Sequence, residues 1–270
     1  MQRGYHRQGT GYIKFVLGRL LLVCGLFTLV GCSTHTAHVA LNQSDQKTLK
    51  VIGIPHFKTQ NRIDIRQENP VYAIIGMSAK AVQLIAREAK RIQYEDENPR
   101  LMKQSIMQMR TVMKKRLRKL GYRVKYLNMS YWQAQSGYRQ GDPRLKDVDA
   151  LLNVELKQYG YFSASPFKPY RPGIVLVADL ITTSDRKRIS SNVYNVGFDK
   201  EDISLLSFRV SYSTNVYVAD QKYFYKNFRT LMSDAKSSSK GLKFVSRVAA
   251  ESVAGDLKKR VANPYLVVKK

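Results

Sequence analysis

The chain has 270 residues, of which 44% are hydrophobic, and its 46 Lys and Arg against 20 Asp and Glu give a formal net charge of +26. This length suits one domain or at most two, and the hydrophobic share is ordinary for a globular protein. The cysteine count excludes a disulfide framework, because Cys24 lies inside an N-terminal apolar run and leaves Cys32 alone. The positive charge indicates a polyanionic partner or, equally, a solvated basic surface.

The N-terminus has the form of a secretory signal peptide. Residues 1–19 carry four basic side chains and no acidic one, and Leu20–Gly31 is almost wholly apolar. This apolar core is too short to span a bilayer, which takes about 20 residues. We therefore expect residues 1–31 to be removed on export, which lowers the net charge by four, from +26 to +22.

The exit from the apolar core, Leu29-Val30-Gly31-Cys32, resembles the lipobox of bacterial lipoproteins. The resemblance implies cleavage between Gly31 and Cys32, a diacylglyceryl group on the Cys32 thiol and acylation of its new amine. Such chains anchor a protein at about 0.8 kcal/mol per buried methylene group. Ser33, after the cysteine, favours the outer membrane in that family. The alternative is an ordinary signal peptide or an uncleaved anchor, with Cys32 incidental.

After the signal, the chain divides into a tether, one domain and a tail. Residues 32–48 are polar and without periodicity, which predicts a flexible tether. Residues 49–262 carry alternating and helical apolar patterns, which predict a single α/β domain. Residues 263–270 follow Lys240–Val261, the last predicted helix, as a C-terminal tail.

The first half of the domain predicts a strand, two helices and a second strand. Leu49–Pro55 begins with alternation and stops at proline, as a strand does. A helix from Ser78 to about Lys90 follows, and its apolar face comprises Ala81, Val82, Ile85, Ala86 and Ala89. Asn98 as N-cap and Pro99 at the first helical position predict a second helix that ends before Gly121. Tyr122–Leu127 then alternates as a strand.

The second half predicts three strands and a helix. Residues 148–162 hold a strand, and Ile174–Thr182 and Ile189–Phe198 form an antiparallel hairpin. Loops are expected at 163–172 and at Ser233–Lys240. The element order predicts an α/β (α+β) fold, with a mixed sheet flanked by two or three amphipathic helices.

Three phrases resemble a group of exported α/β lipoproteins. They are "MKKRLRKLGYRVKYL" (113–127), "VDALLNVELKQYGYF" (148–162) and "VLVADLITTSDRKRIS" (175–190). The group includes the curli-secretion lipoprotein, lipoprotein activators of cell-wall synthases and the Pel-type export lipoprotein. Its members mostly build assemblies or regulate enzymes, which implies a similar role here. The amphipathic hairpins of the curli channel are absent from this sequence, so a channel is not expected.

The sequence offers little chemistry. Neither a nucleophile elbow, a P-loop nor a zinc-protease motif is present. His35 and His38 form an H-x-x-H in the tether, which lacks the fixed geometry and further ligands of a metal site. We therefore expect no metal, no cofactor and no catalytic residue. The alternative is a cell-wall or polysaccharide hydrolase that uses Glu155 and Asp179, which requires the two carboxylates about 5–10 Å apart in one cleft.

Two groups of residues are candidate docking surfaces. The first is a set of basic side chains on the second helix that would contact an anionic surface: Arg110, Lys114, Lys115, Arg116, Arg118 and Lys119. The second is an aromatic set beside a proline-rich loop, which binds protein if exposed and is core if buried: Tyr159, Tyr161, Phe162, Phe167 and Tyr170.

The expected function is that of a membrane-anchored lipoprotein on the periplasmic side of the bacterial outer membrane, acting as a non-enzymatic interaction, assembly or regulatory component. Its expected partners are the membrane, through acylated Cys32, and envelope proteins or an anionic envelope polymer. Nucleic acid is expected only if the chain is not exported.

Overall fold

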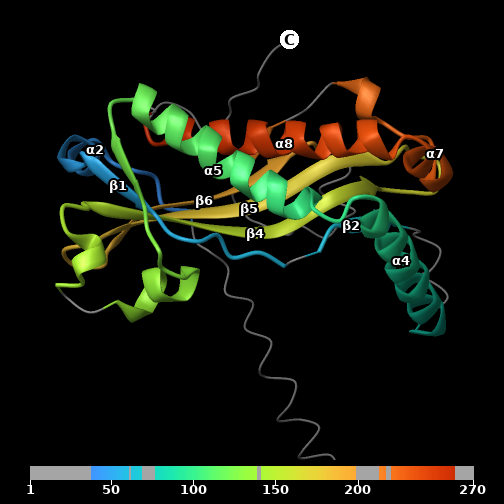
Figure 1. Cartoon of the computed structure of the whole chain (residues 1–270), viewed down its shortest axis with the longest axis horizontal. Helices are drawn as coiled ribbons and strands as arrows, with labels where there is room; N and C mark the ends of the chain where they lie inside the picture. The colour runs from blue at the N-terminus through green and yellow to red at the C-terminus, as the bar shows by residue number, and fades with distance from the viewer. Residues whose placement is uncertain are drawn as a thin grey trace, which may run out of the picture. The chain divides into compact units, whose positions relative to one another are not determined.

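The computed structural model describes residues 38–60, 62–68, 77–138, 141–198, 213–216 and 220–258, with the backbone alone at 77–80, 136 and 137. In these residues a mixed β-sheet is covered on one face by two long helices (Figure 1). The expected α/β (α+β) fold class is confirmed. The predicted signal segment 1–31, its Gly31–Cys32 junction and the tail 263–270 lie outside the described residues.

Seven strands form the sheet: β1 (Val51–Ile54), β2 (Asp64–Gln67), β3 (Arg123–Tyr126), β4 (Ala150–Ser163), β5 (Arg171–Thr182), β6 (Arg188–Val196) and β7 (Thr214–Val216). Their order is β3-β1-β4-β5-β6-β7, and β2 pairs with β4 outside this path. The expected hairpin is confirmed, because β4, β5 and β6 are antiparallel neighbours. The pairs β1–β3, β1–β4, β2–β4 and β6–β7 are parallel.

The α-helices of the described residues are α2 (Gln43–Thr48), α4 (Met77–Glu97), α5 (Leu101–Lys119), α7 (Phe228–Ser233) and α8 (Ala235–Asp256). Three short turns of other helix types complete the list: η1 (Gln133–Gly137), η2 (Pro143–Leu145) and η3 (Gln221–Tyr223). None of these described helices combines the length and the apolar character needed to cross a bilayer.

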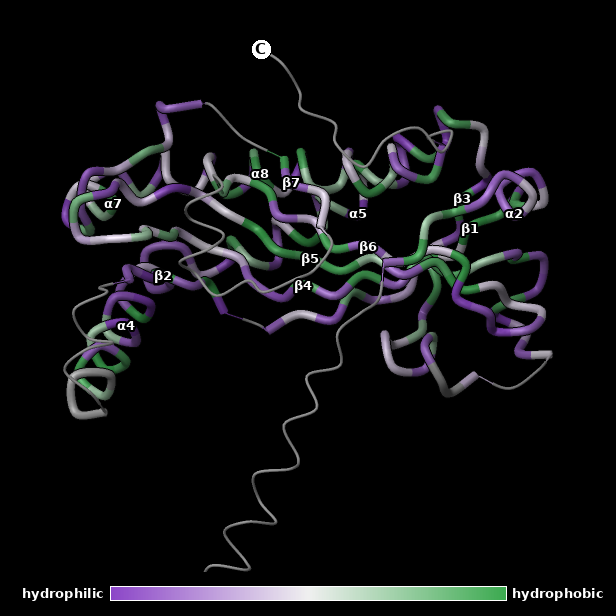
Figure 2. Tube along the Cα trace, turned by 180° about the vertical axis from the view of Figure 1, so that it is seen from behind, coloured by the Kyte–Doolittle hydropathy of each residue, from purple (hydrophilic) through white to green (hydrophobic). Residues whose placement is uncertain are grey.

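The main core lies between the sheet and the pair α5 and α8, which pack against each other. The two helices run across the same side of the strands in Figure 1. The hydropathy colouring of Figure 2 shows the apolar positions gathered along β4, β5 and α8. The second predicted helix is confirmed as α5, and its buried face carries Leu101, Met109, Met113 and Leu117. On α8 small residues such as Ala249 and Ala250 are fully buried and allow close approach to the sheet.

One edge of β4 is shared by two strands. β1 pairs with the start of β4, and β2 pairs with its end, where Asp64 lies opposite Gly160. A Cβ atom on Gly160 would lie 1.8 Å from the backbone oxygen of Asp64, so β2 can approach here only because residue 160 is glycine. This pairing with β4 places β2 in contact with α4.

Residues 32–37 of the predicted tether lie outside the described residues, and the rest of it is folded. Val39 exchanges two backbone hydrogen bonds with Ser191 of β6, both of 2.9 Å, and α2 occupies residues 43–48. The side chain of Asn42 accepts a hydrogen bond from the backbone N–H of Asp45 and thereby caps α2. The prediction of a tether through residue 48 is therefore wrong, because the chain is already part of the fold at Val39.

Two predicted helix starts are also wrong. The side chain of Asn98 donates to the Tyr94 carbonyl at the end of α4 and caps nothing in α5, which begins at Leu101. The expected loop at 233–240 belongs mostly to α8, because Asp234 caps that helix at Ala235. The Ser238 and Ser239 hydroxyls bond to carbonyls one turn back, so the serines are accommodated within the helix.

Candidate interaction surface

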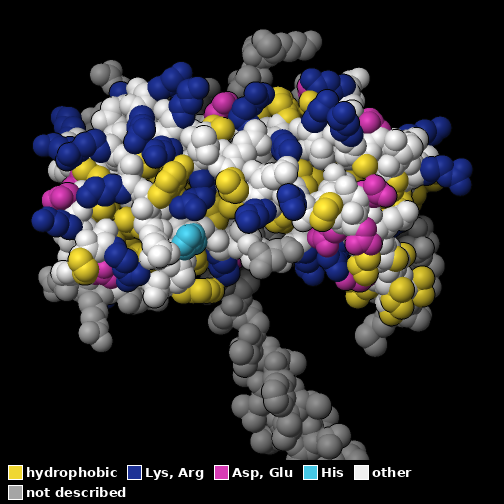
Figure 3. Space-filling view, in the orientation of Figure 1, with side chains coloured by type: hydrophobic (Ala, Val, Ile, Leu, Met, Phe, Trp, Pro, Cys, Tyr) yellow, Lys and Arg dark blue, Asp and Glu magenta, His cyan; other side chains and the backbone are white. Residues whose placement is uncertain are grey.

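Helix α4 presents an apolar face to solvent. The exposed fractions of Val82, Leu84 and Ile85 are 61%, 61% and 72%, and that of Ile92 is 47%. Ala81, Ala86 and Ala89 are exposed between them. Figure 3 shows these side chains as a yellow patch on the part of α4 that projects from the sheet. The predicted apolar face therefore exists, but it points away from the core, whereas the apolar stripe of a surface helix ordinarily faces inward.

The polar side of α4 is the side that contacts the rest of the protein. Arg87 Nη2 lies 2.5 Å from Asp64 Oδ1 on β2, and Gln83 donates to the backbone oxygen of Gln67 at 3.0 Å. Lys90 Nζ is 3.1 Å from the Tyr170 hydroxyl, and burial lowers the pKa of this lysine. Residues three or four apart share a helix side, so these contacts fix one orientation of α4.

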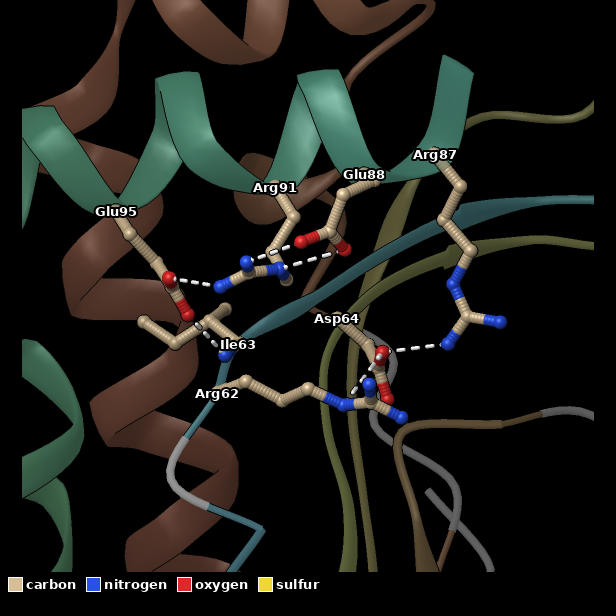
Figure 4. A network of polar contacts seen from close by, with 7 residues as sticks. All are labelled: Arg62, Ile63, Asp64, Arg87, Glu88, Arg91 and Glu95. Carbon is tan, nitrogen blue, oxygen red and sulfur yellow. Dashed lines mark hydrogen bonds and ion pairs between the residues drawn. The ribbon is translucent and has the colours of Figure 1, made fainter. Parts of the chain in front are cut away.

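A second group of contacts fixes the C-terminal half of α4. Arg91 pairs with Glu88 and with Glu95, and Glu95 also accepts a hydrogen bond of 2.7 Å from the backbone N–H of Ile63 (Figure 4). The hydrogen bond from Arg91 is the main reason that the pKa of Glu88 lies below its ordinary value. Tyr94, fully buried, meets the Ser238 hydroxyl of α8 at 2.9 Å. The helix is thus held by polar contacts to two elements.

The charge of the exposed side of α4 differs from that of the molecule. Among residues 81–97 the exposed charged side chains are Glu88, Asp96 and Glu97, whereas Arg87, Lys90 and Arg91 are partly buried on the inner side. In Figure 3 the yellow patch of α4 adjoins magenta side chains, while dark blue side chains are scattered over the rest of the visible face. The outward face is therefore apolar with an acidic border, on a chain of strongly positive net charge.

The predicted basic surface lies on α5 as expected from the helical period. Lys115, Arg116, Arg118 and Lys119 are exposed, and Lys114 is half-buried. Arg110 and Lys114 lie 4.5 and 4.7 Å from the centre of the Tyr126 ring, which orders their side chains by cation–π contact. A shallow depression on this surface is lined by Thr111, Lys114, Lys115, Arg118 and Lys119.

Of the two alternatives for the aromatic set, docking surface or core, the structure selects the core for four of the five members. Tyr159, Tyr161, Phe162 and Tyr170 are at most 3% exposed, and only Phe167, at 97%, lies in solvent. The Tyr159 hydroxyl meets Ser105 of α5 at 2.5 Å, and that of Tyr161 donates to the Ser238 carbonyl at 2.9 Å. Burial raises the pKa of Tyr159 and of Tyr170 to about 12. These tyrosines are core residues whose hydroxyls are satisfied inside the fold.

Glu155 and Asp179 lie on the sheet face opposite α5 and α8, because they alternate with strand residues that pack against those helices. Lys58 Nζ and Lys157 Nζ each lie 2.7 Å from Glu155 Oε1. Burial acts to raise the pKa of Glu155, but the hydrogen bonds from the two lysines outweigh it and lower the pKa.

Asp179 has the opposite environment. Its side chain is 3% exposed, and burial raises its pKa, although Ser191 and Arg188 oppose this shift. Neither the depression on α5 nor a second one, between the start of α5 and α8, is lined by Glu155 or Asp179. Glu155 is therefore paired with lysines and Asp179 is buried, and neither carboxylate lines either of these two depressions.

No protein-family model matches the chain, and no curated protein matches it. Among solved structures, the crystal structure of protein XCC0632 from Xanthomonas campestris, assigned to the family DUF330, is similar with a TM-score of 0.38 and 11% sequence identity. The match covers 82% of this chain and 90% of that one. At this level of similarity it carries no argument about function.

Proposed function

We propose that this chain is a lipid-anchored component of the bacterial envelope that acts through protein–protein contacts rather than by catalysis. The observation that carries the interaction role is the outward apolar face of α4. Exposed apolar patches on monomeric proteins mark interaction sites, and here the polar inner side of the helix excludes a simple rotation that would bury the patch.

The anchor rests on the sequence Leu29–Cys32 behind an apolar core and a basic segment. With Cys32 acylated, the folded body begins only seven residues later, at Val39. An extended chain advances about 3.6 Å per residue at most, so Val39 lies at most about 25 Å from the acylated Cys32. In this proposal Ser33 directs the protein to the periplasmic face of the outer membrane.

The basic surface of α5 supplies a second contact. No described acidic side chain forms an ion pair with Arg110, Lys114, Lys115, Arg116, Arg118 or Lys119. Basic side chains held near an anionic leaflet or polymer contribute about 1 kcal/mol each. We propose that this surface binds lipid head groups or an anionic envelope polymer near the anchor.

The test is the fate of Cys32. Metabolic labelling with a lipid precursor is expected to label the native chain, and Cys32→Ala is expected to abolish the label and shift the protein out of the membrane fraction. A native chain that stays unlabelled and cytosolic would remove the envelope role and make nucleic acid the leading polyanionic partner. The Cys24→Ala variant is the matched control, because that residue lies within the segment removed.

A further inference from the structure

We propose that the apolar face of α4 binds the same face of a second copy of this chain, with the two helices antiparallel. This inference depends on the proposed interaction role of α4, but it does not depend on the acylation of Cys32.

The charged side chains at the ends of α4 oppose the helix dipole. A helix carries partial positive charge at its N-terminus and partial negative charge at its C-terminus. The first turn of α4 contains no acidic residue and its last turn no basic one, while Glu95, Asp96 and Glu97 occupy the C-terminal end. An isolated helix is destabilised by this arrangement.

An antiparallel second copy compensates for this arrangement. Asp96 and Glu97 of each helix then lie beside the first turn of the other helix, where backbone N–H groups carry the partial positive charge. Because a two-fold axis relates the copies, the same favourable contact forms twice. A parallel pair would instead bring the two acidic ends together.

In this antiparallel arrangement the apolar side chains of the two copies also fit against one another. With the axis near the middle of the exposed stretch, Ile85 lies against Ala89 of the partner subunit, and Val82 lies against Ile92 of the partner subunit. Each exposed isoleucine thus meets a smaller side chain, which permits close packing of the two helices. The stripe from Ala81 to Ile92 spans about 16 Å at 1.5 Å per residue.

A membrane surface fits this face less well. Helices that lie in a bilayer interface carry Lys and Arg on their polar side, because the head groups are anionic. Among the described side chains of α4, residues 81–97, the exposed charged ones are Glu88, Asp96 and Glu97, of which Glu88 is paired with Arg91. An acidic border opposes contact with anionic lipid, while it suits the helix N-terminus of a second copy.

The test uses the full chain in intact cells. Two differently tagged copies are expressed together, with Ile85 replaced by a photoactivatable phenylalanine analogue in one of them. Irradiation is expected to give a product that carries both tags, with the cross-linked peptide of the second copy containing Ala89. The same analogue at Met107, which is 60% exposed on α5, is the control and is expected to give no such product.

Three outcomes would overturn the proposal. A product that joins the chain to a different protein would assign the face to that partner. A lipid adduct without a two-tag product would assign it to the membrane. Cross-links from position 85 to position 85 of the second copy would show parallel helices.

A second measurement does not rely on the cross-linker. Co-purification of one tagged copy with the other is expected to fall about tenfold or more for Ile85→Asp, which places a charge in the apolar contact. Met107→Asp is expected to leave it unchanged. Equal effects of the two substitutions would contradict the proposal. Because both residues are exposed, neither variant is expected to prevent folding.

Discussion

Arg87 of α4 and Asp64 of β2 form an ion pair in which the aspartate is almost fully buried, with 5% of its side chain exposed, and the arginine reaches it from the inner side of the helix. The pair explains why α4 lies with its polar side against the sheet. A buried carboxylate needs a charged partner, and on α4 that partner is available only from the polar side. The orientation that exposes the apolar face is therefore the one that satisfies Asp64.

We expect Arg87→Ala to loosen α4 from β2. Removing one partner of a buried pair costs about 3–5 kcal/mol, and Arg62, 4.0 Å from Asp64, places the expected loss near the lower end. Urea unfolding measures the free energy, and amide hydrogen exchange is expected to rise within residues 77–97. The control is Glu88→Gln at the exposed pair with Arg91, which is expected to leave the free energy of unfolding nearly unchanged. Equal losses in the two variants would contradict the role given to Asp64.

Gly160→Ala tests the junction of β2 and β4. The new methyl group would meet the Asp64 backbone oxygen at 1.8 Å, so the strands must separate and α4 must lose its support. We expect a lower thermal midpoint and increased exchange in β2. Gly255→Ala near the end of α8 is the control, because a Cβ atom there meets nothing within 4 Å and alanine favours the helix by about 1 kcal/mol. The prediction fails if both variants keep native stability.

Asp179 and Glu155 are expected to give opposite dependences of stability on pH. Burial raises the pKa of Asp179, so the native state binds its proton more tightly than the unfolded state does, and the aspartate costs stability as pH rises through its raised pKa. Asp179→Asn is therefore expected to increase the free energy of unfolding at pH 7 and to change it little below the ordinary aspartate pKa of 3.8.

The pKa of Glu155 is lowered by its two lysine partners, so Glu155 contributes stability above its ordinary pKa of 4.5 and loses it as pH falls through the lowered value. Glu155→Gln is expected to reduce stability at pH 7. Denaturant unfolding of both variants, from below the ordinary carboxylate pKa values up to pH 7, shows whether each substitution raises or lowers the free energy of unfolding. A loss of stability at pH 7 in Asp179→Asn would show that the pairing with Arg188 outweighs the cost of burial.

The basic surface of α5 is expected to bind anionic vesicles. Replacing Lys114, Lys115 and Arg118 with Gln removes about 3 kcal/mol near a charged surface, which corresponds to roughly a hundredfold weaker binding. Co-sedimentation of the Cys32→Ala chain with vesicles, with and without an anionic lipid, measures this contribution. The matched control replaces three exposed basic residues near α7, namely Lys226, Arg229 and Lys236. Similar losses of vesicle binding in both variants would indicate that binding depends on the net charge of the protein and not on the position of the α5 surface.

The elements that the sequence predicted well are those whose partner is the apolar core. The helix α5 follows from the spacing of Met109, Met113 and Leu117, and the hairpin β5–β6 from its alternation. The orientation of α4 could not be predicted in this way, because its partner surface is the polar strand β2. The apolar and the polar residues of α4 both recur with the helical period, so the sequence does not show which side of the helix faces the sheet. The position of Asp64 in the folded structure determines this.

For Tyr159 and Tyr161, one irregularity in β4 decides between the core and the docking alternative. The pairing with β5 shifts between Leu156 and Gln158, so one residue is added to the strand and the alternation changes phase. Tyr159 and Tyr161 therefore point to the same side as Leu152 and Val154 and enter the main core. The tether, in contrast, contained a readable signal, since Asn42 followed three residues later by Asp45 is typical of a helix start.

The bridge between Val39 and Ser191 has a mechanical consequence. A force applied to the N-terminal side of Val39 acts first on two backbone hydrogen bonds, and it reaches the paired strands only after these have broken. Their rupture releases residues 39–41, up to the cap of α2 at Asn42, and lengthens the connection by about 10 Å. The body of the protein can therefore yield to a pull through this short extension while its core stays folded.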